Sequence, residues 1–201
     1  MADSTDVNHI VDFLFETGIL SKTPRSGFHF LGSGQQSVAE HINRVVFIGY
    51  VLSRLEPNVD RTKVIEMCLF HDLPEARTSD LNYVHQKYAE TKPDAVIRDL
   101  EKNLPFGRDI KETINEYEAR QTKESQLAKD ADQLEWILSL KEQLDIGNNR
   151  AGMKIPSALK RLQTDVAKQL AEKIVTTDSD HWWFSDKDDE WWVNRNRKLE
   201  L

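Results

Sequence analysis

The chain has 201 residues, of which 39% are hydrophobic and 30% are charged, and its formal net charge is -7. This length suits one domain with a sizeable core, and the low Gly and Pro content favours a helical protein over a disordered or all-β one. The acidic balance argues against non-specific binding to a nucleic acid polymer or to an anionic membrane surface.

The single cysteine, Cys68, cannot form an intramolecular disulfide, and the N-terminus lacks the basic and apolar segments of a signal peptide. No apolar run approaches membrane-spanning length. We therefore predict a cytoplasmic protein without membrane contact, built as a single domain over residues 1–201.

Apolar residues at helical spacing predict a first helix over residues 7–20, and Gly18 favours its end there. Residues 22–35 contain Pro and three Gly and are predicted to form a loop. On this loop, Arg25 and Phe28 could clamp an anion and stack on a ring. A solvated arginine and an aromatic loop anchor would also explain them, and the residues alone favour this second interpretation.

Ser37 and Glu40 have the spacing of a capping box, which predicts that a helix begins at residue 38. Apolar residues then recur at alternating steps of three and four and share their face with His41; they are Val38, Val45, Ile48 and Leu52. A lone histidine on such a face is more often a hydrogen-bonded core residue than a metal ligand.

The next helix is predicted to begin after Asp60 and to run to His71. His71 and Asp72 fall where the next turn of its apolar face would lie. A buried carboxylate is costly unless a partner pairs with it, and Pro74 provides a helix end at which one ion could engage both side chains. A hydrogen bond between His71 and Asp72 is the alternative explanation.

Further helices are predicted over residues 93–104, 109–120, 124–144 and 156–175, the last opened by Pro156. The sequence therefore predicts an all-α fold with a core over about 7–175. Asp132 lies beside the apolar stripe of the 124–144 helix. An aspartate at such a position is usually exposed to solvent, and a metal ligand is the alternative interpretation. The acidic tail over about 176–201 contains two tryptophan pairs, which more often cover core or a subunit interface than stack on bases.

Four candidate ligands thus lie on three helices that are predicted to be buried: His41, His71, Asp72 and Asp132. Imidazole and carboxylate without thiolate suit one divalent ion such as Mn²⁺, Co²⁺, Fe²⁺, Ni²⁺ or Zn²⁺. Their order along the chain resembles the H…HD…D signature of HD-domain metal-dependent phosphohydrolases. Residues 24–28 resemble the Pro-Arg-x-Gly-Trp segment of the branch that contains 5'-deoxynucleotidases, and residues 116–118, 129–134 and 147–149 also look like that branch.

This resemblance implies a single-domain helical HD-domain fold and a metal-dependent phosphomonoesterase that hydrolyses (deoxy)nucleoside 5'-monophosphates. It implies that Arg25 binds the 5'-phosphate and that Glu75 and Asp80 are the catalytic carboxylates. It also implies a metal site and a substrate site, the first made of His41, His71, Asp72 and Asp132 and the second of Arg25, Phe28, His41, Asp72, Asp80 and Asp132.

Three questions stay open from the sequence. Phe28 stands where the family commonly has Trp, so the choice between deoxyribose and ribose is undecided. An HD-domain hydrolase of a triphosphate, a cyclic nucleotide or a guanosine alarmone is an alternative, as is a non-catalytic metal-binding or nucleotide-binding scaffold. The family and the tryptophans suggest a homodimer.

Overall fold

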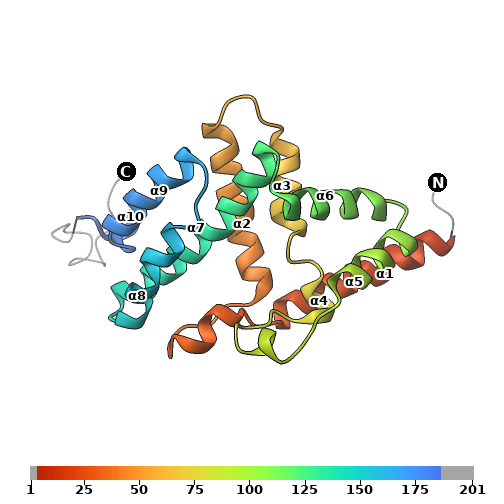
Figure 1. The fold of residues 1–201 in the computed structure, drawn as a ribbon, viewed down its shortest axis with the longest axis horizontal. Coiled ribbons are helices and arrows are strands. Elements are labelled where there is room, and N and C mark those ends of the chain that lie inside the picture. Colours follow the sequence, from red (N-terminus) through yellow and green to blue (C-terminus); the bar gives the residue numbers. More distant parts are fainter. Residues whose placement is uncertain (1–3, 187–201) are drawn as a thin grey trace, which may run out of the picture.

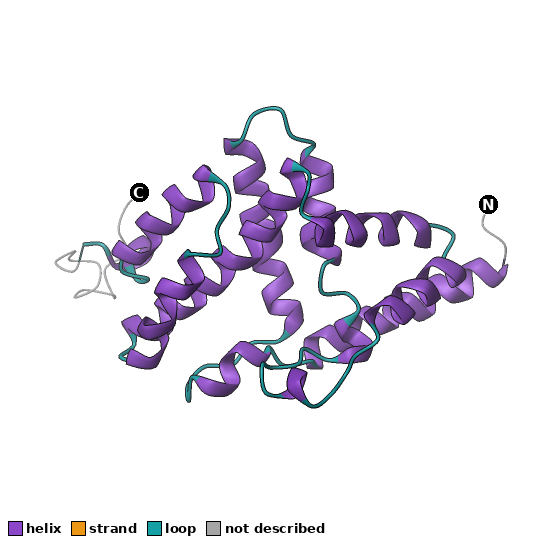
Figure 2. Cartoon of the chain, viewed as in Figure 1, coloured by secondary structure: helices purple, strands orange, loops and turns teal. Residues whose placement is uncertain are grey.

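Capping side chains mark several helix starts in the computed structural model, which describes residues 4–186. Ser37 and Glu40 form both bonds of the predicted capping box, and the Asp60 side chain accepts from the N–H groups of Thr62 and Lys63. Within residues 4–186 there is no β-strand, only an isolated bridge between Pro24 and Ser37 (Figure 2). The prediction of an all-α fold is confirmed.

The α-helices of the described part are, in chain order, α1 (Ser4–Thr17), α2 (Val38–Leu55), α3 (Arg61–Phe70), α4 (Glu75–Thr78), α5 (Pro93–Asn103), α6 (Gly107–Ala119), α7 (Lys123–Asp145), α8 (Asn149–Leu159), α9 (Asp165–Thr176) and α10 (His181–Phe184). Three 3-10 helices lie between them: η1 (Gly18–Lys22), η2 (Ser26–Phe30) and η3 (His85–Lys87). The segment predicted as a loop over 22–35 therefore contains a helical turn, η2.

Helix α7 occupies the centre of the molecule and packs against α2, α3, α6, α8 and α9 (Figure 1). Its apolar residues are buried on several sides, among them Leu127, Ala131, Leu134 and Ile137. A second apolar cluster joins α1, α5 and α6 to the first turns of α2, through residues such as Phe13, Val38, Ile42, Leu100 and Ile110. The candidate ligands come from the start of α2, the end of α3 and the middle of α7.

Helix α3 packs one face against the core. Val64, Met67 and Cys68 are buried, whereas Leu69 is 46% exposed. Burial raises the pKa of the Cys68 thiol, so this cysteine stays protonated in the core.

The prediction of one helix opened by Pro156 is wrong. Pro156 lies inside α8, which begins at the Asn148 cap, and a separate helix, α9, begins after Thr164. The break is stabilised by Asp130 on α7, whose carboxylate accepts from the backbone N–H of Gln163 at 2.9 Å and of Thr164 at 2.7 Å. Because Asp130 is more than thirty residues from this break, local sequence patterns do not reveal the contact.

Replacing the buried Asp130 by Ala is expected to lower the free energy of unfolding by about 2–3 kcal/mol, because two N–H groups at the start of α9 lose a charged acceptor. Thermal and urea denaturation measure the change. The control is Asp165→Ala, which removes a 94% exposed carboxylate from the same helix start and is expected to cost less than about 1 kcal/mol. Equal losses in the two variants would contradict the assignment.

The tryptophan-rich C-terminal segment lies at the edge of the described chain. Trp182 is 84% exposed, so it does not cover the core of this chain, and Trp191 and Trp192 lie outside the described residues.

Among the helices of residues 4–186, none is both long enough and apolar enough to cross a membrane.

Candidate active site

The packing of α2, α3 and α7 brings the four candidate ligands together. His41 Nε2 on α2 lies 3.4 Å from His71 Nε2 at the end of α3 and 3.3 Å from Asp132 Oδ1 on α7. Asp72 Oδ2 lies 3.5 Å from His41 Nε2 and 3.3 Å from His71 Nε2. One ligand atom from each of His41, His71 and Asp132 lies within 4.8 Å of the other two, so these three could contact one first-row divalent cation, whose bonds to nitrogen and oxygen are about 2.0–2.2 Å. Asp72 lies beside this group, and its role as a fourth ligand stays a prediction.

Both imidazoles are oriented by their other ring nitrogen. His71 Nδ1 lies 2.9 Å from the carbonyl oxygen of Cys68, and His41 Nδ1 lies 2.7 Å from Glu135 Oε2. Because a carbonyl or carboxylate oxygen can only accept, each Nδ1 carries the proton and donates. In the neutral ring this leaves Nε2 to bind a metal. Burial and Arg25 oppose the charged form of His41, but its hydrogen bonds to Asp132 and Glu135 raise its pKa to about 9, so without a metal its Nε2 also carries a proton that a bound cation would displace.

The partner of His41, Glu135, was missed by the sequence analysis. Its side chain is fully buried, and its Oε1 accepts from Arg44 Nη2 at 2.8 Å and from Gln36 Nε2 at 2.7 Å. Burial opposes ionisation of Glu135, but the hydrogen bond to His41 and the charge of Arg44 lower its pKa to about 2. The spacing contained a signal: His41 and Arg44 on α2 and Asp132 and Glu135 on α7 are each one helical turn apart.

Asp132 is held from its outer side. Its Oδ2 accepts from Lys129 Nζ at 2.8 Å and from Tyr117 Oη at 3.3 Å, while Oδ1 faces His41. Burial opposes its ionisation, but Lys129 and His41 hold the pKa of Asp132 well below its usual range. The carboxylate is thus charged and aimed at the imidazole.

Arg25, which caps η2, reaches the edge of the ligand set. Its Nη1 donates to Asp72 Oδ2 at 3.2 Å and to Asp80 Oδ2 at 3.0 Å, and its Nη2 lies 4.0 Å from Asp132 Oδ1. Burial opposes the charged form, but the three aspartates hold the pKa of Arg25 above its usual range. An anion bound beside the four candidate metal ligands would therefore also contact the guanidinium of Arg25.

The two remaining carboxylates have different surroundings. Asp80 accepts from the Ser26 N–H at 3.0 Å and the Ser26 hydroxyl at 2.7 Å, besides Arg25, so it anchors η2. Glu75 Oε2 is buried and has no hydrogen-bond partner among the described residues. Burial, and then the charges of Asp72 and Asp80, raise the pKa of Glu75 to about 9. Glu75 therefore holds a proton at neutral pH in this state.

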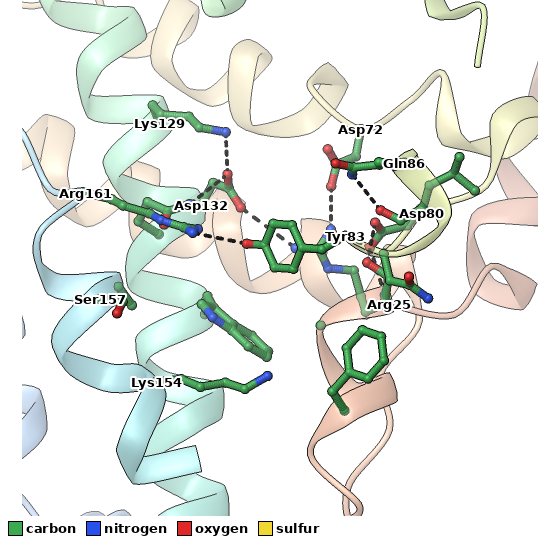
Figure 3. Close-up of a pocket in the computed structure, with 18 of the residues that line it drawn as sticks. Arg25, Asp72, Asp80, Tyr83, Gln86, Lys129, Asp132, Lys154, Ser157 and Arg161 are labelled. Atoms are coloured by element: carbon green, nitrogen blue, oxygen red, sulfur yellow. Dashed lines mark hydrogen bonds and ion pairs between the residues drawn. The ribbon is translucent and has the colours of Figure 1, made fainter. Parts of the chain in front are cut away.

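A cavity of about 510 Å³ opens beside this cluster (Figure 3). Arg25, Asp72, Asp80 and Asp132 line it, whereas the other residues of the predicted site, Phe28, His41, His71 and Glu75, do not. Phe28 instead packs edge-on against Trp136, with ring centroids 5.7 Å apart, and Trp136 lines the cavity together with Phe30 and Tyr83. A role of Phe28 in substrate binding stays a prediction.

A family model described as HD domain matches residues 17–175. The chain belongs to the HD domain family. The 5'-deoxynucleotidase hdd1 of Schizosaccharomyces pombe is 25% identical over 143 residues, which cover 66% of this chain and 71% of that protein. The 5'-deoxynucleotidase HDDC2 of Dictyostelium discoideum is 30% identical over 153 residues, which cover 68% and 78%.

Solved structures share the fold of this HD domain. A conserved hypothetical protein from Pyrococcus furiosus superposes with a TM-score of 0.68 at 31% identity, over 82% of this chain and 96% of that chain.

The orienting role of Glu135 in this HD domain can be tested by Glu135→Gln. The amide is expected to weaken divalent metal binding about 10–100-fold, because it can donate to His41 as well as accept from it and so no longer imposes one ring state. Titration calorimetry on metal-free protein measures the affinity. Glu142→Gln is the control, since Glu142 also pairs with Arg44 but makes no contact with His41. Unchanged affinity in Glu135→Gln would refute the role.

Proposed function

We propose that this HD domain protein is a metal-dependent phosphomonoesterase that hydrolyses (deoxy)nucleoside 5'-monophosphates, with deoxynucleotides as the first candidates. The observation that carries the proposal is the convergence of two imidazoles and two carboxylates beside the Arg25 guanidinium. The relatives named 5'-deoxynucleotidase support the choice of substrate class.

In this proposal one divalent ion is held by His41, His71, Asp72 and Asp132. Neutral imidazoles and carboxylates without thiolate fit Mn²⁺, Co²⁺, Fe²⁺, Ni²⁺ or Zn²⁺. When bound, such an ion lowers the pKa of a bound water and polarises a phosphoryl oxygen.

Arg25 binds the phosphate. Its Nη1 makes both of its hydrogen bonds, to Asp72 and Asp80, so its Nη2 and Nε keep donors for two phosphate oxygens. The planar fork of arginine suits this geometry, and its charge offsets the growing negative charge on the phosphoryl oxygens. Asp80 and Ser26 hold the backbone that carries Arg25.

Glu75 donates a proton to the leaving 5'-oxygen. An alkoxide is a poor leaving group, and a carboxyl that stays protonated near neutral pH can supply the missing proton. Of the two proposed catalytic carboxyls, Glu75 and Asp80, only that of Glu75 has a buried oxygen without a hydrogen-bond partner among residues 4–186. It lies outside the cavity lining here, and such catalytic contacts commonly tighten only when substrate binds.

The proposal includes one domain over the whole chain and a homodimer. The outer face of α2 leaves Phe47, Tyr50, Val51 and Leu55 exposed by 44–66%, which is a large apolar face for a monomer. Sedimentation equilibrium tests this part, and a monomer at micromolar concentration would contradict it.

A substrate panel tests the activity. The protein, loaded with each divalent ion in turn, is incubated with deoxynucleoside and ribonucleoside monophosphates, triphosphates and cyclic nucleotides. One phosphate per nucleoside is expected from the monophosphates. Release of pyrophosphate or triphosphate, or opening of a cyclic nucleotide without monophosphate hydrolysis, would move the protein to another branch of HD-domain hydrolases.

A further inference from the structure

The outer wall of the cavity carries two cationic side chains that no carboxylate pairs with. Lys154 and Ser157 on α8, and Arg161 in the turn after it, are three and four residues apart and line the cavity together (Figure 3). Lys154 makes no hydrogen bond or ion pair with the described residues, and Arg161 donates only to the uncharged hydroxyl of Tyr83, at 3.1 Å. These donors are available to a ligand.

An aromatic side chain lies next to this row. Trp136 lines the cavity and is held from behind by Phe28, whose ring meets it at 81°. Gly27 leaves room for the indole, because a Cβ atom at residue 27 would come within 2.8 Å of it. Tyr83 also lines the cavity, and its hydroxyl accepts from Arg161. Two flat rings at the cavity suit a planar heteroaromatic group.

Between the ligand cluster and the aromatic wall lies an unpaired acceptor. Gln133 lines the cavity, is 8% exposed, and its Oε1 has no hydrogen-bond partner among the described residues. Its neighbours in the cavity are Asp132, in the ligand cluster, and Trp136 one turn further along α7. A sugar hydroxyl placed between phosphate and base would satisfy this oxygen.

We propose that Trp136, Lys154, Ser157 and Arg161 form a nucleobase subsite that prefers guanine and thymine to adenine and cytosine. Lysine and arginine can only donate hydrogen bonds. Guanine presents O6 and N7 and thymine presents O4 as acceptors, whereas adenine and cytosine present exocyclic amino groups that are donors. An amino group facing Lys154 and Arg161 would meet only donors, and of the polar side chains in the row Ser157 alone could accept from it. The inference rests on the proposed function, which places the phosphate at Arg25.

The four deoxynucleoside monophosphates test the preference. In the wild type we expect kcat/KM about tenfold higher for dGMP than for dAMP, and for dTMP than for dCMP, as one well-placed set of hydrogen bonds allows. Lys154→Met and Arg161→Met are each expected to lower kcat/KM for dGMP and dTMP about tenfold and for dAMP and dCMP less than about twofold. The control is Lys160→Met, which removes the same charge from an exposed residue that does not line the cavity.

Two results would overturn the subsite. Equal kinetic losses on all four substrates would mean that the row only attracts the phosphate, and losses confined to nucleoside 3',5'-bisphosphates would make it a second phosphate site. Binding of neutral deoxyguanosine and deoxyadenosine, measured by NMR titration, separates this inference from the proposed function. Tighter binding of deoxyguanosine that is lost in Lys154→Met supports the subsite even if no monophosphate is hydrolysed, and equal binding of both nucleosides overturns it.

Discussion

Glu75→Gln is expected to lower kcat about 10²–10⁴-fold while leaving metal content unchanged, because the amide keeps the shape of the carboxyl but cannot give its proton to the leaving oxygen. Since an acid works only while protonated, the wild-type kcat should fall as the pH rises through the pKa of Glu75. That pKa is raised to about 9 here by burial and by Asp72 and Asp80, and a bound cation lowers it. This alkaline limb should be absent in Glu75→Gln.

Asp80→Asn provides the comparison. Asp80 holds Arg25 and Ser26, so its loss is expected to raise KM more than it lowers kcat. A Glu75→Gln variant with wild-type kcat, or an Asp80→Asn variant with the larger loss in kcat, would reverse the two roles.

Asp132→Asn is expected to lose the bound ion and to lower kcat/KM at least about 10³-fold, because the site loses a charged ligand and the chemistry that the ion supplies is worth several kcal/mol. Elemental analysis of the purified variant gives the metal content, and phosphate release gives the rate. Asp109→Asn, at an exposed carboxylate far along the chain from the ligands, serves as the control and should retain both. Full metal content in Asp132→Asn would exclude Asp132 as a ligand.

The same contacts explain how the site can be formed before a metal binds. Three of the four candidate ligands are tied on their far side: His41 to Glu135, His71 to the Cys68 carbonyl, and Asp132 to Lys129. These ties hold the two imidazoles and Asp132 with their remaining donor atoms close together before an ion arrives. The cations Arg25, Lys129 and Arg44 offset the charges that would otherwise repel one another.

Local sequence patterns predicted the parts of the fold that depend on local chemistry. The Ser37 capping box, the Asp60 cap and the helix opened by Pro93 are all present, because a cap and its helix are neighbours in the chain. Pro156 misled the prediction because a proline is tolerated inside α8, and the true start of α9 depends on the distant Asp130.

In the candidate site, too, features that depend on residue type and order were predicted, whereas contacts between distant parts of the chain were not. The residue types and order of His41, His71-Asp72 and Asp132 pointed to a metal without any knowledge of distances. Glu135 was not found, because its bond to His41 joins residues 94 positions apart. Trp136 was not found either, since its place at the cavity follows from the packing of α7 against η2 and from the small Gly27, neither of which a helical pattern contains.

The most direct test removes the metal and restores it. The protein is stripped with a chelator, dialysed, and then titrated with each divalent ion while phosphate release from a deoxynucleoside 5'-monophosphate and bound ion are measured together. The expected result is no phosphate release without an ion and full release when one ion per chain is bound. Two results would contradict the proposed function: phosphate release that is unaffected by removal of the metal, or no phosphate release with any of the ions even when one ion is bound per chain.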